Sequence, residues 1–176
     1  MVIALLVVLV LISVLLVFAY NSLVRLRNKC EESEASLNAH LKERYDLVPN
    51  LVETVKGYAK HESATLEAVI AARNRAGKEG GVADDGLSEA LVRLFALSES
   101  YPELKADKGF VTLQEQLMRL ESEILNARKY YNAVVRTYND KTMVFPTSVL
   151  AGIFHFEKKE YLMTEEKAKE RVEVKF

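Results

Sequence analysis

Hydrophobic residues fill the first stretch of the chain almost without interruption. Between Val2 and Tyr20 only Ser13 is polar, and the first charged side chain is that of Arg25. A helix of about 19 residues is roughly 28 Å long, which is close to the thickness of the hydrocarbon layer of a bilayer. A core helix of a soluble domain would carry a polar face, and this segment has none. We therefore predict that residues 1–21 form a transmembrane anchor.

The flanks of this segment predict how it lies in a membrane. Arg25, Arg27 and Lys29 follow it closely, and no basic residue precedes it. The positive-inside rule then places the C-terminal domain in the cytoplasm and the N-terminus outside, as a single-pass protein of the cell (plasma or inner) membrane. A cleaved signal peptide is the alternative, with Val17 and Ala19 as a weak cleavage signal. Its apolar stretch is normally only about 7–15 residues long and follows a basic start.

Beyond the anchor, residues 22–163 carry apolar side chains at spacings of three, four and seven, which is typical of helices that bury one face. The first such face consists of Leu23, Leu26, Cys30, Leu37, Leu41, Tyr45 and Val48. Pro49 is expected to end this helix, because proline disfavours the helical conformation in the residue before it. The corner of an antiparallel helical hairpin is therefore predicted at Asp46 to Asn50.

The remaining pattern predicts a second hairpin helix, a linker, a short helix and one long helix. The heptad-like seam of the second helix, typical of a coiled coil, consists of Leu51 or Val52, Val55, Ala59, Glu62, Leu66, Val69 and Arg73. Residues 76–86 are rich in glycine and aspartate and are predicted to be a linker before a short helix over 87–98. Thr112 and Glu115 form a capping box that predicts the start of the longest soluble helix, which should end before Pro146.

A short terminal helix is predicted over 149–154, and no strand is predicted ahead of the tail. We therefore expect an all-α fold, in which a single transmembrane helix runs into an antiparallel, elongated helical bundle. Three parts follow from this reading: the anchor over 1–21, the bundle over 22–163 and a charged C-terminal tail over 164–176.

Composition narrows the classes of partner and site. The formal net charge is −1, so no excess of basic residues favours nucleic acid as a partner. Cys30 is the single cysteine, so no intrachain disulfide can form. We interpret it as a residue of a packed helix face, with acylation beside the membrane as the alternative.

The pair His61-Glu62 is the strongest candidate for metal chemistry in the sequence. It begins like the zinc motif H-E-x-x-H, but Thr65 occupies the position of the second histidine. Neither a phosphate-binding loop nor a G-x-S-x-G motif occurs. We therefore predict no catalytic residue, no metal site, no cofactor and no enzymatic activity. The alternative is a metal-binding or hydrolytic protein that uses His61, Glu62 and nearby carboxylates.

Polar residues on the predicted helix faces are candidates for binding a partner or for fixing helix register. Glu62 on a bundle seam requires a partner, because an isolated buried carboxylate is costly. Arg73 lies roughly 16 Å along the same helix, which is too far for direct pairing. Arg128 on the long helix is a candidate partner, and a binding pocket around Glu62 is the alternative. Two Tyr-Asn pairs one heptad apart should set register on the long helix. The full set is Asn50, His61, Glu62, Arg73, Arg128, Tyr131, Asn132, Tyr138 and Asn139.

Several stretches together resemble the LemA family of membrane-anchored helical proteins. They are YNSLVRLRNKCEESEASLNAHLKERYDLVPNLVETVKGYAKHE (20–62), AARNRA (71–76), LQEQLMRLESEILNARKYYNAVVRTYND (113–140) and FPTSVLAGIFHFEKKEYL (145–162). The resemblance implies an N-terminal membrane helix with a short external N-terminus and a helical-bundle body, and it implies no enzymatic activity. The family tends to have a glycine before the aromatic residue at Phe156, where this chain has His155.

The sequence therefore predicts a non-enzymatic interaction or scaffold protein at the membrane. Its expected partners are the lipid bilayer, through the N-terminal helix, and a protein that the sequence does not identify. A homo-oligomer formed through the long helices is also a candidate. An envelope-organising component on the external face is the second alternative to the scaffold role, beside the metal-binding one.

Overall fold

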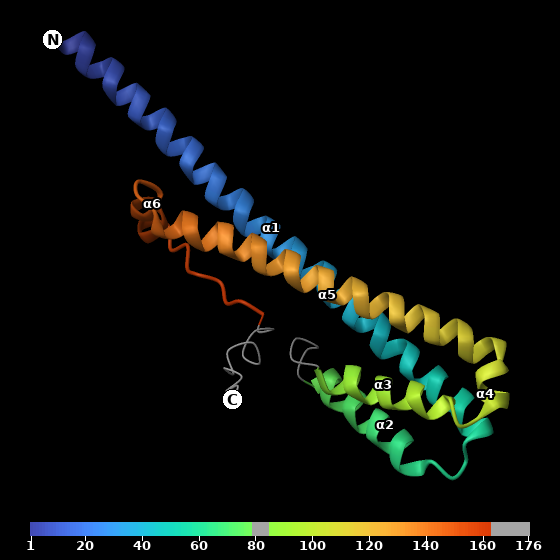
Figure 1. Ribbon diagram of the computed structural model, residues 1–176. Helices are drawn as coiled ribbons and strands as arrows, with labels where there is room; N and C mark the ends of the chain where they lie inside the picture. Colours follow the sequence, from blue (N-terminus) through green and yellow to red (C-terminus); the bar gives the residue numbers. More distant parts are fainter. Residues whose placement is uncertain (79–84, 163–176) are drawn as a thin grey trace, which may run out of the picture. The chain divides into compact units, whose positions relative to one another are not determined.

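The computed structural model describes residues 1–78 and 85–162, and within these ranges the regular secondary structure consists of helices, without strands (Figure 1). The helices are α1 (Val2–Tyr58), α2 (Ser63–Lys78), α3 (Asp85–Ser98), α4 (Pro102–Ala106), α5 (Lys108–Met143) and α6 (Thr147–Ile153). The predicted all-α fold is confirmed. The predicted tail over 164–176 lies outside the described residues, as does most of the predicted linker.

Two compact units make up the chain. The first combines Met1–Ala35 with Lys129–Tyr161, and so contains the start of α1, the end of α5 and all of α6. The second is built on Ser36–Arg128 and contains the rest of α1, helices α2 to α4 and the start of α5.

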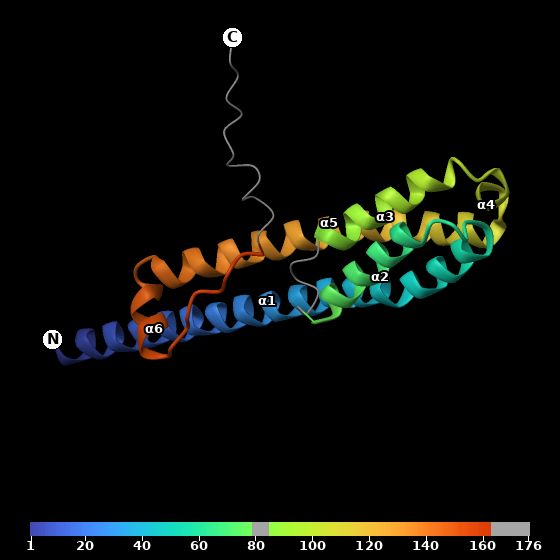
Figure 2. The ribbon, with the colours of Figure 1, turned by 90° about the horizontal axis from the view of Figure 1, so that it is seen from below.

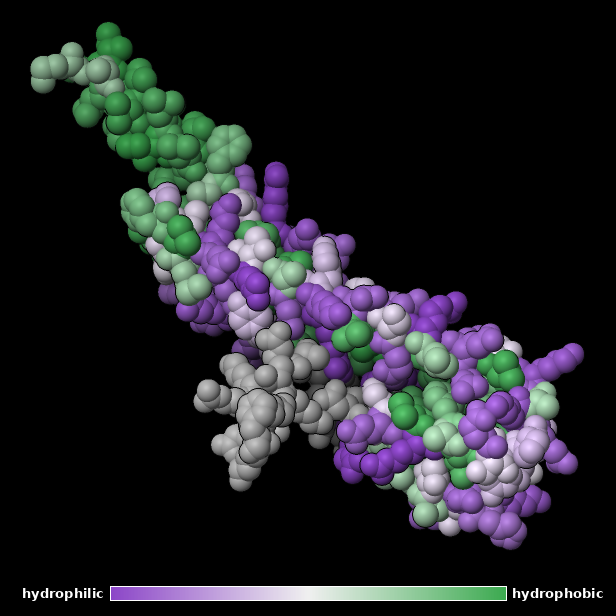
Figure 3. All heavy atoms as spheres, in the orientation of Figure 1, coloured by the Kyte–Doolittle hydropathy of each residue, from purple (hydrophilic) through white to green (hydrophobic). Residues whose placement is uncertain are grey.

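The start of α1 is the apolar segment that the sequence identifies as an anchor. Helix α1 contains a stretch that is long and apolar enough to cross a membrane. Residues 1–18 are exposed, so no described part of the protein covers them. Figure 3 shows this end of the chain as a continuous hydrophobic surface. Contact of such a surface with water is unfavourable, whereas the hydrocarbon layer of a membrane would surround it with apolar groups.

The second unit is held together by a core that draws on α1 to α5. Its buried members include Val48, Leu51 and Val55 of α1, Leu66 and Val69 of α2, Leu87, Leu91 and Leu94 of α3, Leu104 of α4, and Phe110 and Leu117 of α5. Helices α2 and α3 lie side by side as an antiparallel pair in both ribbon views (Figures 1 and 2). A smaller cluster joins Leu37 and Leu41 of α1 to Leu120 and Ile124 of α5. The spacings of three, four and seven thus identify the buried faces correctly.

The hairpin corner predicted at Asp46 to Asn50 is wrong. Helix α1 continues through Pro49 to Tyr58, and the chain turns between Tyr58 and Ser63. Proline usually breaks a helix in part because it provides no N–H for the carbonyl four residues earlier. Here that carbonyl belongs to Tyr45, and a side chain from α2 donates to it instead, as described below.

The start of α5 also differs from the predicted capping box. The helix begins at Lys108, and the side chain of Asp107 accepts a hydrogen bond of 2.8 Å from the backbone N–H of Phe110. Asp107 is therefore the N-cap, a role that short polar acceptors fill well. Thr112 lies inside the helix, where its hydroxyl donates to the carbonyl of Lys108 at 2.8 Å.

Helix α6 ends in a left-handed residue, a conformation that glycine usually provides, and here His155 adopts it before Phe156. His155 adopts the left-handed conformation, with φ of 54°. The N–H of Phe156 then donates to the carbonyl of Ala151 at 2.9 Å, which is the hydrogen bond of a Schellman motif. Histidine is among the residues that tolerate this region better than most.

Candidate functional site

Asn139 of α5 binds the main chain of a segment that follows α6. Its Nδ2 donates to the carbonyl of Lys159 at 2.8 Å, and its Oδ1 accepts from the N–H of Lys159 at 2.9 Å. The side chain is only 4% exposed, so the backbone of Lys159 replaces water for both of its polar atoms. An amide that pairs with both groups of one residue recognises a peptide backbone in an extended conformation.

Two buried tyrosines of α5 extend this contact. Tyr138 donates to the carbonyl of Glu157 at 2.9 Å, and Tyr131 donates to the carbonyl of Glu160 at 3.3 Å. Seven helical residues advance about 10.5 Å, and three extended residues advance about 10 Å. The two spacings match, so one tyrosine can reach each end of the segment. The later tyrosine binds the earlier residue, so residues 157–160 run antiparallel to α5. We call Tyr131, Tyr138 and Asn139 the backbone clamp.

Burial also affects the ionisation of the clamp tyrosines. Desolvation raises the pKa of the phenols of both Tyr131 and Tyr138 above the ordinary value. A phenol is already protonated at neutral pH, and the raised pKa extends the range in which both hydroxyls are donors to more alkaline pH. Cys30 of α1 lies in the same unit and is fully buried, and its burial likewise raises the pKa of the thiol. A buried, protonated thiol is a poor acylation site, which disfavours that alternative.

The predicted Tyr-Asn pairs thus have a partner that the sequence did not indicate. Tyr131, Tyr138 and Asn139 meet the chain's own backbone, and Asn132 is half-buried on the same helix. Whether these residues also set register between helices stays a prediction. The heptad spacing of the pairs is the feature of the sequence that could have indicated this contact, because seven helical residues span the same distance as three extended ones.

A second polar cluster lies in the other unit and joins three helices. Arg44 of α1 is 2% exposed, and its Nη1 lies 2.7 Å from Oε1 of Glu121 on α5. The same nitrogen donates to Ser88 of α3 at 2.9 Å, and Ser88 donates to Oε2 of Glu121 at 3.0 Å. Arg128 lines a cavity of about 400 Å³ together with these residues. The sequence reading missed this cluster, although Arg44 stands three residues after Leu41 on the apolar face of α1.

Arg73 completes the helix around Pro49. Its Nε donates to the carbonyl of Tyr45 at 3.0 Å, and its guanidinium carbon lies 3.7 Å from the centre of the Tyr45 ring. The charged donor replaces the N–H that Pro49 lacks. Gly77 allows the tyrosine to sit close to α2, because an added Cβ there would lie 2.9 Å from a ring carbon.

The pairing of Glu62 with Arg128 is not found. Because α1 ends at Tyr58, Glu62 lies in the turn before α2 and not on a continuous helical seam. It accepts a hydrogen bond of 3.0 Å from the hydroxyl of Tyr101, and this bond is the main cause of a raised Tyr101 pKa. His61 is exposed in the same turn, and Asn50 is exposed on α1. Across residues 1–78 and 85–162, no three metal-ligating side chains are grouped to hold an ion.

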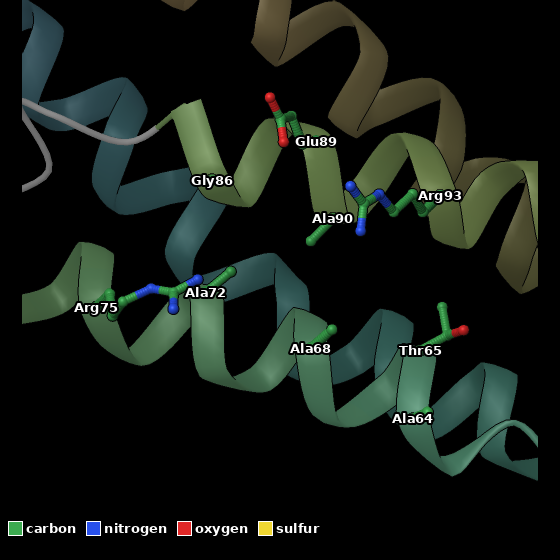
Figure 4. Close-up of a pocket in the computed structure, with 9 residues that line it drawn as sticks. All are labelled: Ala64, Thr65, Ala68, Ala72, Arg75, Gly86, Glu89, Ala90 and Arg93. Carbon is green, nitrogen blue, oxygen red and sulfur yellow. The ribbon is translucent and has the colours of Figure 1, made fainter.

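The antiparallel pair α2–α3 encloses a groove of about 320 Å³ (Figure 4). Small residues from both helices line it, among them Ala64, Ala68, Ala72, Gly86 and Ala90. Arg75 of α2 and Arg93 of α3 line it as well, together with Glu89. We call this the α2–α3 groove.

These features define a membrane-associated protein with a helical body, in which the apolar segment and part of the bundle core belong to the same helix, α1. The LemA family model matches residues 33–176, and the chain belongs to the LemA family.

Curated relatives agree with this assignment. The chain is 27% identical to magnetosome protein MamQ 1 of Paramagnetospirillum magneticum and 25% identical to MamQ of Magnetospirillum gryphiswaldense, each over 83% of this chain. It is 25% identical to protein LemA of Metamycoplasma hominis, over 74% of this chain and 63% of that protein. The chain matches 65% of the length of each of these MamQ proteins, which is less than two thirds.

Proposed function

We propose that this protein is a non-enzymatic scaffold, anchored in the membrane by residues 1–21 and holding a protein partner through the bundle over 22–163. One observation supports this most directly. Glu62, the carboxylate that the sequence marks as a candidate for metal chemistry, accepts a hydrogen bond from Tyr101, and Asn139, a candidate for partner binding, binds the main chain of Lys159. The relatives' names, magnetosome protein MamQ and protein LemA, specify no reaction.

The α2–α3 groove is the proposed binding surface for the partner. Its alanines and glycine leave room for another backbone to approach closely, as small residues do where helices pack. Arg75 and Arg93 contribute two positive charges to its walls, against one negative charge from Glu89. The groove therefore suits a helix of a partner protein with acidic side chains on its contact face.

Photo-crosslinking in cells tests this surface. A photoreactive residue at Ala68, in the groove, is compared with the same residue at Ala71, which is exposed on α2 outside the groove. We expect one discrete adduct from position 68 that is absent from position 71 and is lost when Arg75 and Arg93 are both replaced by glutamate. Equal adducts from both positions, or an adduct that survives the charge reversal, would contradict the proposal. An adduct of twice the chain mass would indicate a homo-oligomer instead.

The orientation of the anchor is the second part of the proposal. Arg25, Arg27 and Lys29 support a cytoplasmic body and an external N-terminus in the cell membrane. A C-terminal fusion to a reporter that folds only outside the cytoplasm should be inactive, while a cytoplasmic reporter should be active. The reverse result would refute this orientation and favour the envelope-organising alternative on the external face.

A further inference from the structure

Helix α6 and the turn before it expose an unusual amount of apolar surface. Phe145 is 79% exposed and Ile153 is 62% exposed, and the same surface includes Met143, Val144, Val149 and Phe154. From residue 143 to residue 154 the chain has no charged side chain. The surfaces of soluble domains rarely carry such a continuous apolar group unless it binds something.

Both faces of α6 are apolar. Leu150 and Ala151 are buried against the protein, while Val149 and Ile153 point away from it and are exposed. A helix that is hydrophobic all round belongs in fully apolar surroundings. Among the described residues, 1–78 and 85–162, the protein supplies these surroundings on one face only, so the exposed face is left for another component.

The contact with α1 indicates which component that is. Phe154 lies against Tyr20, the last residue of the apolar segment, with ring centres 4.8 Å apart. The ring centre of Phe156 lies 5.8 Å from that of the same tyrosine. Amphipathic aromatic residues such as Tyr20 typically lie at the membrane surface. Helix α6 is therefore next to the point where α1 leaves the bilayer, and Figure 3 shows hydrophobic side chains gathered there beside the anchor.

The charges around this surface favour the headgroups of anionic lipids. Between residues 20 and 30, directly after the apolar segment, the charged side chains are the three basic ones of Arg25, Arg27 and Lys29. Lys141 donates to Ser22 at 2.7 Å, which holds a basic residue of α5 beside the end of the apolar segment. Arg27 lies over the ring of Phe156 at 5.3 Å. Basic residues bordering an apolar surface are typical of helices that lie in the membrane interface.

We propose that α6 and the turn at 143–146 form a second membrane contact, which inserts the exposed apolar face into the same bilayer that holds residues 1–21. The side chains of Phe145, Val149 and Ile153 enter the acyl region, and the neighbouring basic residues meet the headgroups. This contact is independent of the scaffold role and of the α2–α3 groove.

Tryptophan fluorescence tests this proposal without background, because the chain contains no tryptophan. Phe145→Trp in the full chain is reconstituted into vesicles of zwitterionic and anionic phospholipid, with or without bromine on the acyl chains. Leu9→Trp, inside the apolar segment, is the positive control. Tyr130→Trp, at an exposed position of α5 in the same unit, is the negative control.

We expect brominated lipid to quench Phe145→Trp and Leu9→Trp strongly and to leave Tyr130→Trp almost unchanged. Bromine near the headgroup end of the acyl chain should quench Phe145→Trp more than bromine near the methyl end. If Leu9→Trp is quenched while Phe145→Trp behaves like Tyr130→Trp, α6 does not enter the bilayer and the proposal is overturned. A blue-shifted but unquenched Phe145→Trp would also overturn it, because a protein surface would then cover α6. Failure of Leu9→Trp to be quenched would refute the anchor as well.

Discussion

Arg73 should stabilise the protein by completing the hydrogen bonding of α1 at Pro49. Replacing it with methionine keeps most of the apolar stem but removes the donor to the Tyr45 carbonyl and the charge over the Tyr45 ring. A hydrogen bond from a charged group contributes about 1.5–3 kcal/mol, and a partly exposed cation–π contact about 0.5–1 kcal/mol. We therefore expect Arg73→Met to lower the free energy of unfolding by about 2–4 kcal/mol.

A double-mutant cycle separates this effect from general damage to packing. Pro49→Ala restores an N–H at position 49, which can donate to the Tyr45 carbonyl within the helix. In the Pro49→Ala protein, Arg73→Met should lower the free energy of unfolding by about 1 kcal/mol less than in the wild type, because the Tyr45 carbonyl keeps a donor. All four proteins would be unfolded with urea as full chains in a mild detergent, with helix content followed by circular dichroism.

Equal costs of Arg73→Met in the wild-type and Pro49→Ala backgrounds would refute the reasoning, since the arginine would then not act through the carbonyl freed by proline. Arg75→Met is the matched control, because Arg75 is exposed two residues further along α2. It should change the unfolding free energy by less than about 0.5 kcal/mol.

Three further predictions concern the other polar contacts. Glu121→Ala removes the carboxylate that pairs with the buried guanidinium of Arg44 and should lower the free energy of unfolding in urea by about 3 kcal/mol. An unchanged urea midpoint would contradict a stabilising role of this cluster. The carboxylate of Asp107 accepts a hydrogen bond from the backbone N–H of Phe110, which lowers the pKa of the carboxyl below its ordinary value of 3.8. The carboxylate therefore contributes its full stabilisation above pH 3.8, and this stabilisation should be lost as the pH falls through the lower pKa of the folded state. The melting temperature of Asp107→Asn should fall less over this range than that of the wild type. Asn139→Ala should release residues 157–160 and speed tryptic cleavage there, and unaltered cleavage would argue against the backbone clamp.

Much of the fold could be predicted because burial follows helical periodicity. The uninterrupted apolar start of α1 and the stripes on the long helices are local patterns, and the buried residues follow them. The course of the chain at Pro49 could not be predicted in this way. Proline ends most helices, and here the compensation comes from Arg73, which is distant in sequence and reaches Tyr45 only in the folded protein.

The candidate site was predictable in its residues but not in its partners. Tyr131, Tyr138 and Asn139 were marked by their type and heptad spacing, yet they bind peptide groups, which leave no trace in the side-chain sequence. Arg44 was overlooked because a charged residue on an apolar face is normally assigned to solvent. Its burial depends on Glu121, which is far away in sequence.

The backbone clamp has a consequence for how this stretch of the chain can evolve. The clamp contacts peptide groups of residues 157–160, and in the same segment the ammonium of Lys159 lies 3.8 Å from Oε1 of Glu31 on α1. These hydrogen bonds do not depend on the side chains that they hold, except that proline at position 159 would have no N–H to donate to Asn139. Substitutions in the segment therefore leave the hydrogen bonds of the clamp in place while they change the charge of its surface.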